Sequence, residues 1–386
     1  NSIKIYVDSV GYRNLIEFFD VWGNKERDFE MVYAYSYKRV DDGALYSQKM
    51  MLSKNGKRTY DRSGVSSVLM EYSDDRLIKE WFVDDSEKPT NNKDGYGIRQ
   101  WIYDEKGRLS KTDYYDKDGN PVLINGDRGL CHMVEYLYDS FGGYKQLRFY
   151  DKDKKLKSEG CAFVNIKSDN LGREIETVQY SSDSLPFAMD NGVAGERKMY
   201  EDSNNQTLVT TSFNLCDENS VCEDKYGVAF YKYEYDRRGN KLKATCFSED
   251  SCKVNNIYGY SEIVSKYDDD NNMLEQWFYT KDGELVENKS RGCAGLICMY
   301  DEKGNLVKES FFDEKRKPKQ LDGNVHSIEY EYDWFNNMTK RVYKDLNGNN
   351  VKGQLIYART FDPYGNVVVE ECFADDGMTF VNNAKG

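Results

Sequence analysis

The chain holds nine cysteines, and eight of them fall into four pairs whose spacing could close disulfides. Five residues separate the members of two pairs and four separate those of a third, so each of these pairs could bridge a short loop. The members of the fourth pair occupy the same position in successive copies of a sequence repeat and could meet across neighbouring copies. The pairs are Cys216/Cys222, Cys246/Cys252, Cys293/Cys298 and Cys131/Cys161, which leaves Cys372 over. Disulfides favour an oxidising compartment, and reduced thiols in an intracellular protein are the alternative.

Two short segments carry oxygen ligands at alternate positions before a glycine, DKDGN at 116–120 and DLNGN at 345–349. Carboxylate and amide oxygens spaced in this way are typical of loops that bind Ca²⁺. The candidate calcium ligands are Asp116, Asp118, Asp345 and Asn347. Neither segment has the downstream glutamate of an EF-hand, and Asp, Asn and Gly are also the ordinary residues of solvated turns, which is the alternative. No other cofactor is expected.

The five tryptophans divide between predicted turns and predicted strands. Trp22 and Trp334 fall inside turns, which favours exposure, and exposed indole rings stack on sugars or anchor protein interfaces. These two are therefore candidate binding residues. Trp81, Trp101 and Trp277 lie on predicted strands, where aromatic side chains are expected to pack between repeats.

Residues for catalysis are scarce in this chain. The two histidines, His132 and His326, offer little for a Ser-His-Asp or Cys-His arrangement, and without a CxxC motif they do not indicate zinc. No Gly-rich phosphate loop is present. Acidic residues could supply a glycosidase-like carboxylate pair, but they recur in register with predicted turns, whereas an active site normally interrupts a repeat. The sequence therefore predicts a protein that is not an enzyme.

The net charge of −13 and the isoelectric point near 4.9 limit the partners of the protein. Nucleic acids and anionic membrane surfaces both require a basic protein surface, so neither is expected as a partner. No apolar run approaches the roughly 18 residues of a spanning helix, so membrane insertion is not expected. The chain begins at Asn1 without a signal segment, which fits a trimmed product or a fragment of a longer protein.

One short pattern recurs along most of the chain with a period of about 32 residues. An aromatic residue precedes Asp in most of the copies, and the residue four places after the aromatic is Gly or Asn, both of which tolerate the positive φ of a tight turn. The aromatic anchors are Tyr103, Tyr138, Tyr200, Tyr235, Tyr267, Tyr300, Tyr332 and Phe361, and the turn residues are Gly107, Gly142, Asn204, Gly239, Asn271, Gly304, Asn336 and Gly365. About ten or eleven copies would cover residues 1–386, with degenerate copies at 1–70 and 155–225.

Each copy has the pattern of a β-hairpin. Aromatic and charged residues alternate before the anchor, as in YKYEYD at 231–236, which places the aromatic side chains on one face of a strand. A second strand follows the turn and ends in an aromatic pair such as Phe311-Phe312. A single hairpin cannot bury such a face, so the sequence predicts one all-β domain, an elongated, solenoid-like tandem array of hairpins. A closed β-propeller is the alternative.

The Tyr-Asp pairs and their turn residues resemble the Tyr-Asp (YD, RHS-type) repeats of bacterial secreted and cell-surface proteins. The resemblance rests on three copies and extends thinly over most of the chain: Tyr103-Asp104 with Gly107, Tyr235-Asp236 with Gly239-Asn240, and Tyr300-Asp301 with Gly304-Asn305. It implies a secreted or surface protein that works in adhesion, binding or encapsulation. Nothing resembling the C-terminal toxin or self-cleaving segment of that family is evident.

The sequence thus predicts a non-enzymatic repeat scaffold, extracellular or at the cell surface, that binds or adheres to a glycan or a cell-surface protein. The second hypothesis is a structural subunit of a surface filament or shell, in which exposed strand edges pair with other copies of the chain. The third is a carbohydrate-active enzyme, which would require a catalytic acid outside the repeat register.

Overall fold

The computed structural model describes residues 2–20, 22–40, 43–126, 129–203, 206–361 and 367–381. Within these ranges every regular element is a β-strand except one short 3-10 helix, η1 (Asp322–Asn324), so no helix there is long and apolar enough to cross a membrane. The strands group into two compact units, an N-terminal unit (Asn1–Phe187) and a C-terminal unit (Ala188–Gly386). The boundary between the units falls inside the degenerate region predicted at 155–225.

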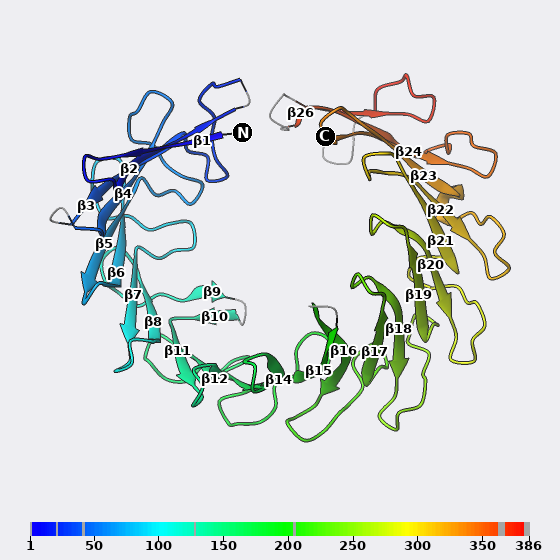
Figure 1. Ribbon diagram of the computed structural model, residues 1–386, viewed down its shortest axis with the longest axis horizontal. Helices are drawn as coiled ribbons and strands as arrows, with labels where there is room; N and C mark the ends of the chain where they lie inside the picture. Colours follow the sequence, from blue (N-terminus) through cyan, green and yellow to red (C-terminus); the bar gives the residue numbers. More distant parts are fainter. Residues whose placement is uncertain are drawn as a thin grey trace. The chain divides into compact units, whose positions relative to one another are not determined.

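The N-terminal unit is a series of six antiparallel hairpins in chain order, drawn in blue to green in Figure 1. Its hairpins are β1 (Ser2–Val7) with β2 (Arg13–Phe19), β3 (Ala34–Arg39) with β4 (Tyr46–Leu52), β5 (Ser67–Ser73) with β6 (Arg76–Val83), β7 (Ile98–Tyr103) with β8 (Leu109–Tyr115), β11 (Met133–Tyr138) with β12 (Tyr144–Tyr150), and β13 (Phe163–Ser168) with β14 (Glu174–Tyr180). A small extra hairpin of β9 (Ile124–Gly126) and β10 (Gly129–Cys131) lies in the connection between β8 and β11.

The C-terminal unit repeats the same plan with six hairpins. They are β15 (Gly195–Ser203) with β16 (Gln206–Leu215), β17 (Phe230–Tyr235) with β18 (Lys241–Phe247), β19 (Glu262–Tyr267) with β20 (Met273–Tyr279), β21 (Gly295–Tyr300) with β22 (Leu306–Phe312), β23 (Ser327–Tyr332) with β24 (Met338–Lys344), and β25 (Ile356–Phe361) with β26 (Val367–Phe373).

Strand pairing is long within a hairpin and short between hairpins. Strands β7 and β8 pair over their whole length, from Ile98↔Tyr115 to Tyr103↔Leu109. Strands β6 and β7, from neighbouring hairpins, pair only at Lys79–Trp81 with Ile98–Gln100. We call the end of a hairpin that carries these inter-hairpin pairs its base, and the end that carries the turn after the anchor its tip. In the described pairings, the backbone ladder joins neighbouring hairpins at the base and not at the tip.

The buried core also lies at the base, where the connector after each hairpin covers one face of the sheet. In the C-terminal unit, Phe311 on β22 packs with Leu296 on β21 and with Val325, which lies in the connector that follows β22. In the N-terminal unit, Met51 on β4 packs in the same way with Val65 from the next connector. Burial of these apolar side chains is the main favourable contribution to the stability of each unit.

The turn at the tip explains why Asp follows most of the anchors. In the turn at 301–305, the amide of Asp301 donates to the carbonyl of Asn305 and the amide of Gly304 donates to the carbonyl of Asp301, both at 3.0 Å. The Asp301 Oδ1 atom accepts hydrogen bonds from the amides of Lys303 and Asn305, each at 2.9 Å. The aspartate therefore pairs amide groups that the short turn would otherwise leave open.

The all-β tandem array of hairpin repeats is confirmed within both units. The degenerate segments at 1–70 and 155–225 form the same hairpins as the clear copies, so the described residues form twelve repeat hairpins where the sequence predicted ten or eleven copies. The positive φ predicted at the turn residue is confirmed at Gly304 (81°) and Asn336 (65°). The predicted turn residues Asn204 and Gly365 lie outside the described residues.

Candidate binding site

The anchor tyrosine ties each tip to the preceding hairpin. The Tyr103 hydroxyl donates to the carbonyl of Leu77, at the start of the second strand of the previous hairpin, at 2.9 Å. The same bond recurs from Tyr138, Tyr235, Tyr300 and Tyr332 to the carbonyls of Leu109, Val209, Met273 and Leu306, at 2.8–3.1 Å. Burial raises the pKa of the Tyr300 hydroxyl to about 12, which keeps it protonated as a donor. This hydrogen bond of the tyrosine side chain thus links neighbouring hairpins at the tip, where their strands are no longer paired through the backbone.

Because neighbouring hairpins separate toward their tips, hollows form beside the anchors. Three of them occupy the same place in the repeat, between the tip of one hairpin and the Tyr-Asp pair of the next. Their volumes are about 650 Å³ beside Tyr103 in the N-terminal unit, and about 590 Å³ beside Tyr300 and 230 Å³ beside Tyr235 in the C-terminal unit. The hollow beside Tyr103, which we call the Trp101 hollow, is the largest of the three.

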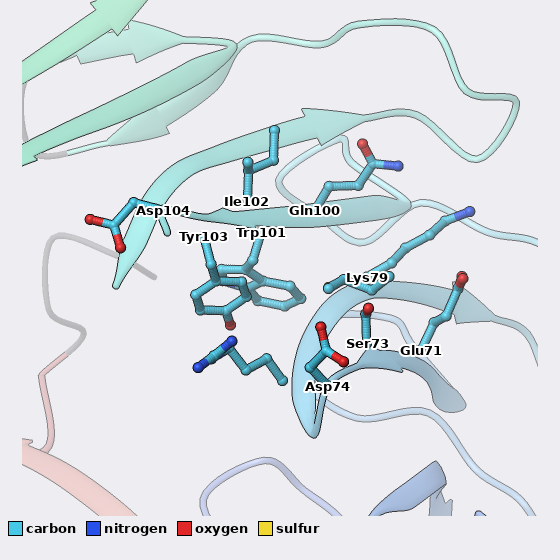
Figure 2. Close-up of a pocket in the computed structure, with 11 residues that line it drawn as sticks. Glu71, Ser73, Asp74, Lys79, Gln100, Trp101, Ile102, Tyr103 and Asp104 are labelled. Atoms are coloured by element: carbon cyan, nitrogen blue, oxygen red, sulfur yellow. The ribbon is translucent and has the colours of Figure 1, made fainter. Parts of the chain in front are cut away.

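The Trp101 hollow combines aromatic, acidic, basic and amide side chains (Figure 2). Trp101 and Tyr103 project from β7 to the same side, and Asp74 and Lys79 from the β5–β6 hairpin lie across from them. The remaining lining residues are Glu71, Ser73, Arg76, Ile78, Gln100, Ile102 and Asp104. An aromatic wall surrounded by hydrogen-bonding groups of both kinds suits a ligand that has an apolar face and several hydroxyl groups.

Two guanidinium groups order the aromatic wall of this hollow. The Arg99 guanidinium lies 4.8 Å from the centre of the Trp101 ring, and that of Arg76 lies 5.8 Å from the centre of the Tyr103 ring. Arg76 reaches this position because the neighbouring tip has a glycine: a Cβ on Gly107, whose φ is +77°, would lie 2.3 Å from an Arg76 nitrogen. Gly107 thus adopts the positive φ of the turn and also leaves room for the Arg76 side chain in the hollow.

The hollows of the C-terminal unit are more acidic and have no tryptophan in their lining. The one beside Tyr300 is lined by Asp268, Asp270, Asn272, Leu274, Asp301, Glu302, Lys303 and Gly304 as well as the tyrosine. Neighbouring tips of this unit are also joined by side chains, since the Asn240 amide donates to Asn271 at 2.8 Å and the Asn305 amide donates to Asn336 at 3.0 Å. These bonds hold the tips in a fixed row.

The candidate tryptophans Trp22 and Trp334 are exposed, as predicted, with 56% and 81% of their surface accessible. Neither lines any of the three hollows, although the Lys303 Nζ atom lies 4.2 Å from the centre of the Trp334 ring. Trp277 is buried in the core, as expected for a strand position. Trp101 was expected there too and instead lines a hollow. Its position two residues before a Tyr-Asp pair is the signal that could have identified it.

The four candidate calcium ligands belong to turns at the base, and the structure gives two of them another role. Asp116 Oδ1 accepts from the amides of Asp118 and Asn120, at 2.9 and 2.8 Å, and its Oδ2 accepts from the Asn120 side chain. Asp345 Oδ1 accepts in the same way from the amides of Asn347 and Asn349. In the described residues, no three acidic, histidine or cysteine side chains come together as a metal site. These hydrogen bonds fit the solvated-turn alternative, and calcium binding by the four residues stays a prediction from the sequence.

One of the four cysteine pairs forms a disulfide. Cys216 and Cys222 are bonded, with their Cα atoms 5.6 Å apart, across the base turn after β16. Cys246 and Cys252 have the same spacing but lie two residues earlier in their hairpin. The amide of Val254 donates to the carbonyl of Cys246, and the equivalent hydrogen bond in the other hairpin runs from the amide of Cys222 to the carbonyl of Asn214. Cys246 is thus equivalent to Asn214 and not to Cys216. Cys246 therefore lies buried on β18, Cys252 is exposed in the turn, and both carry free thiols. Burial raises the pKa of Cys246 to about 12, which makes its thiol unreactive.

The other two pairings also differ from the prediction, because Cys131, Cys293 and Cys298 carry free thiols. Cys293 and Cys298 lie along one extended segment, and five extended residues span about 16 Å, well beyond the Cα separation of a disulfide. Cys131 precedes β11 and Cys161 precedes β13, and β12 pairs between these two strands. Equivalent positions in successive hairpins are thus two strands apart, about 9.6 Å, which is too far for a bridge.

The two histidines occupy equivalent places in the repeat. His132 packs edge-on against Tyr115, and its Nδ1 lies 3.3 Å from the carbonyl of Val122. His326 packs in the same way against Phe312, with its Nδ1 3.0 Å from the carbonyl of Lys319. Both rings therefore tie a connector to the end of a second strand.

No family model matches the chain, and no curated protein matches it. Among solved structures, the chain is similar to a TcdB2-TccC3-TEV crystal structure, with 12% identity over 96% of this chain and 18% of that one, and a TM-score of 0.36. A TcdB2-TccC3 crystal structure gives 13% identity over 96% of this chain and 27% of that one, with a TM-score of 0.23. A Tc holotoxin pore from Photorhabdus luminescens gives 13% identity over 88% and 22%, with a TM-score of 0.20.

This chain spans less than a third of the length of each of these three structures. At TM-scores below 0.5 the similarities carry no argument about function. The resemblance of the Tyr-Asp pairs to YD repeats therefore stays a prediction from the sequence.

Proposed function

We propose that this chain is a non-enzymatic scaffold, acting outside the cytoplasm or at the cell surface, that binds a glycan in the Trp101 hollow. The observation that carries the proposal is the combination of Trp101 and Tyr103 with the side chains of Asp74, Glu71 and Lys79 in one hollow. A pyranose ring presents an apolar C–H face that stacks on an indole and hydroxyl groups that hydrogen-bond to carboxylates and ammonium groups. These are the two kinds of group that the hollow offers.

The recurrence of the hollow supports a polymeric ligand over a single sugar. Within the C-terminal unit, the hollows beside Tyr235 and Tyr300 hold their ligand groups at a spacing set by whole hairpins, and a chain-like glycan that occupies both gains affinity through effective concentration. The acidic hollows beside Tyr235 and Tyr300 offer carboxylates and tyrosine without an indole, so we assign them a weaker contribution.

Two further observations support the compartment and the class of partner. The Cys216–Cys222 disulfide fits maturation in an oxidising compartment. The net charge of −13 disfavours nucleic acid and anionic membrane surfaces and leaves neutral or basic glycans and cell-surface proteins as partners. Mass mapping of the cysteines in protein isolated without reductant, after free thiols have been trapped, tests the compartment; a reduced Cys216 and Cys222 would contradict it.

The binding site is tested by calorimetry of the purified chain against a panel of oligosaccharides, with three variants. Trp101→Ala is expected to weaken glycan binding at least tenfold and Trp101→Tyr to retain most of it, because the tyrosine keeps a stacking ring. Trp334→Ala is the matched control, since it removes an exposed indole at a tip and Trp334 does not line the hollow. No binding to any glycan, or a loss of binding only with Trp334→Ala, would contradict the proposal. Turnover of a bound glycan would favour a carbohydrate-active enzyme instead.

A further inference from the structure

Two adjacent aromatic side chains are exposed at one hairpin tip of the C-terminal unit. Trp334 and Phe335, in the turn between β23 and β24, are 81% and 62% accessible. The turn does not require them, because the equivalent positions of the turn after Tyr300 hold the charged residues Glu302 and Lys303. Exposed aromatic side chains are enriched at protein interfaces, where a few of them supply most of the binding energy. The pair is therefore a candidate docking surface that the fold itself does not need.

Hydrogen bonds hold this aromatic pair in a fixed position. The amide of Phe335 donates to Asp333 Oδ1 at 2.8 Å, inside the turn. The Lys303 ammonium group, on the preceding tip, donates to the carbonyl of Trp334 at 3.0 Å, and its Nζ atom lies 4.2 Å from the centre of the indole ring. A surface that is ordered before binding loses less conformational entropy when a partner docks. The Lys303 contact also shows that the face of this indole accepts a cation.

The charge around the aromatic pair determines the chemistry of its partner. The turns 268–272, 301–305 and 333–337 together hold six carboxylates and one lysine. The carboxylates are those of Asp268, Asp269, Asp270, Asp301, Glu302 and Asp333. A segment rich in arginine or lysine is complementary to these tips, whereas a second copy of the chain, with its net charge of −13, is repelled by them.

Contacts between neighbouring tips arrange them in a row. Arg238 donates to the carbonyl of Asp269 on the next tip at 2.6 Å, which is the counterpart of the bond from Lys303 to Trp334. Between these two contacts, the hollow beside Tyr300 is lined by residues of both adjoining tips. Successive hairpins are two strands apart, about 10 Å, so three successive tips span about 20 Å. The aromatic pair thus stands at one end of a continuous acidic surface.

We propose that the tip with Trp334 and Phe335, together with the two acidic tips before it, docks an extended, arginine-rich segment of a partner protein. Guanidinium planes stack on aromatic rings, and their forked N–H groups pair with carboxylates such as those of Asp270 and Glu302. An extended segment of about seven residues covers three tips. The site is independent of the glycan proposal, in which the hollow beside Tyr300 makes only a weaker contribution.

Binding of defined peptides tests the chemistry of the partner. The probe is a fluorescent peptide of about ten residues in which arginine and proline alternate, since proline keeps the peptide extended. Fluorescence anisotropy with the purified chain is expected to show binding of this peptide, at least about threefold weaker binding of the lysine–proline peptide and no binding of the glutamate–proline peptide, because only arginine combines stacking with forked hydrogen bonds. No binding of the arginine peptide at protein concentrations up to about 0.1 mM, or equal binding of the arginine and lysine peptides, would overturn the proposal.

Variants of the chain locate the docking surface. Trp334→Ala is expected to weaken binding of the arginine peptide at least about tenfold, and Trp334→Tyr to retain most of it because the tyrosine keeps a stacking ring. Asp270→Asn with Glu302→Gln is expected to weaken binding and to reduce its dependence on salt. The matched control is Asp282→Asn with Glu284→Gln, which removes the same charge from the exposed base turn after β20.

The same titrations separate a docking surface from general attraction between opposite charges. Binding that is unchanged by Trp334→Ala, or equal weakening by the acidic tip variant and its matched control, would show that the peptide responds only to net charge and would contradict the proposed surface. Circular dichroism checks that each variant folds. Trp101→Ala is expected to weaken glycan binding and to leave peptide binding unchanged, so the two proposals can fail separately.

Discussion

The base and the tip of each hairpin are held together by different interactions. At the base, neighbouring hairpins share a backbone ladder, and connectors bury side chains such as Phe278 and Leu296. At the tip, the link between hairpins consists of single polar bonds, such as that from the Tyr300 hydroxyl to the carbonyl of Met273. The base therefore supplies most of the stability, while the tip supplies the exposed, variable surface.

The difference appears in the residues that each end tolerates. In five hairpins whose tip turn begins with aspartate, the third residue of the turn is Val10, Phe141, Leu171, Arg238 or Phe335. The turn needs the carboxylate and the positive φ, and the side chain between them is exposed at Phe141, Leu171 and Phe335. Surface can thus change from hairpin to hairpin without a change of fold, which suits a binding scaffold.

Truncating a buried side chain should give the largest difference in stability between the base and the tip of a hairpin. Phe278→Ala at the base, where the side chain is 1% accessible, is expected to lower the free energy of unfolding by about 3–5 kcal/mol. Phe335→Ala at a tip, where the side chain is 62% accessible, is expected to change it by less than about 0.5 kcal/mol. Urea denaturation followed by circular dichroism measures both. Similar losses in the two variants would contradict the division of the hairpin into a stabilising base and a variable tip.

The cysteine pairs offer a test at the base itself. Cys222→Ser is expected to lower stability by about 2 kcal/mol, the chain-entropy contribution of a bridge that closes a loop of this size. Cys252→Ser is the control. Cys252 belongs to the pair Cys246/Cys252, which has the same spacing but lies two residues earlier in its hairpin, and the substitution is expected to have almost no effect on stability because the Cys252 thiol is free and exposed. Thermal unfolding without reductant measures both. An equal loss from Cys252→Ser would show that the second pair is bridged as well.

Removing the anchor hydroxyl should lower the free energy of unfolding less than truncating a core side chain or breaking the disulfide. Tyr300→Phe removes the donor to the Met273 carbonyl and is expected to cost about 1 kcal/mol. Tyr267→Phe is the matched control: it occupies the same anchor position, and the structure gives its hydroxyl no hydrogen bond. The free energy of unfolding of the two variants should differ accordingly. If both lose the same amount, the inter-hairpin bond is not the source of the effect.

A single turn carboxylate should give the smallest effect, seen as a change in pH dependence. Hydrogen bonds from the Asn305 side chain and amide lower the pKa of Asp301 below its ordinary value of 3.8. A lowered folded-state pKa contributes stability that is present above the unfolded value and is lost as the pH falls through the folded value. Asp301→Asn keeps the oxygen acceptor but does not titrate, so it should lose less stability than the native chain between about pH 4.5 and 2.

The neighbouring Glu302→Gln is the control for this pH dependence, since the Glu302 side chain accepts no hydrogen bond in the structure. Its stability should follow the native curve throughout the titration. A flattened curve for Glu302→Gln would indicate general charge repulsion and not the turn hydrogen bonds as the source of acid sensitivity.

Local features of the fold could be predicted because they depend on residues close in sequence. The aspartate, the Gly or Asn that follows it and the alternation before Tyr235 each act within one hairpin, so the period of the sequence sufficed to predict turns, strands and array. The role of Trp101 could not be predicted in this way. Its side chain lines a hollow only because the β5–β6 hairpin diverges from β7 toward the tip.

The sequence alone determined the repeating hairpin, because tight turns and two-residue alternation are set by the chemistry of adjacent residues. Only the tertiary structure decided which cysteines bond and which aromatic side chains face a hollow. These outcomes depend on register between segments: a two-residue offset separates the bonded Cys216 from the free Cys246, and an intervening strand separates Cys131 from Cys161. The bonded pair Cys216/Cys222 and the unbonded pair Cys246/Cys252 have the same spacing along the chain, and they differ in their register within the hairpin.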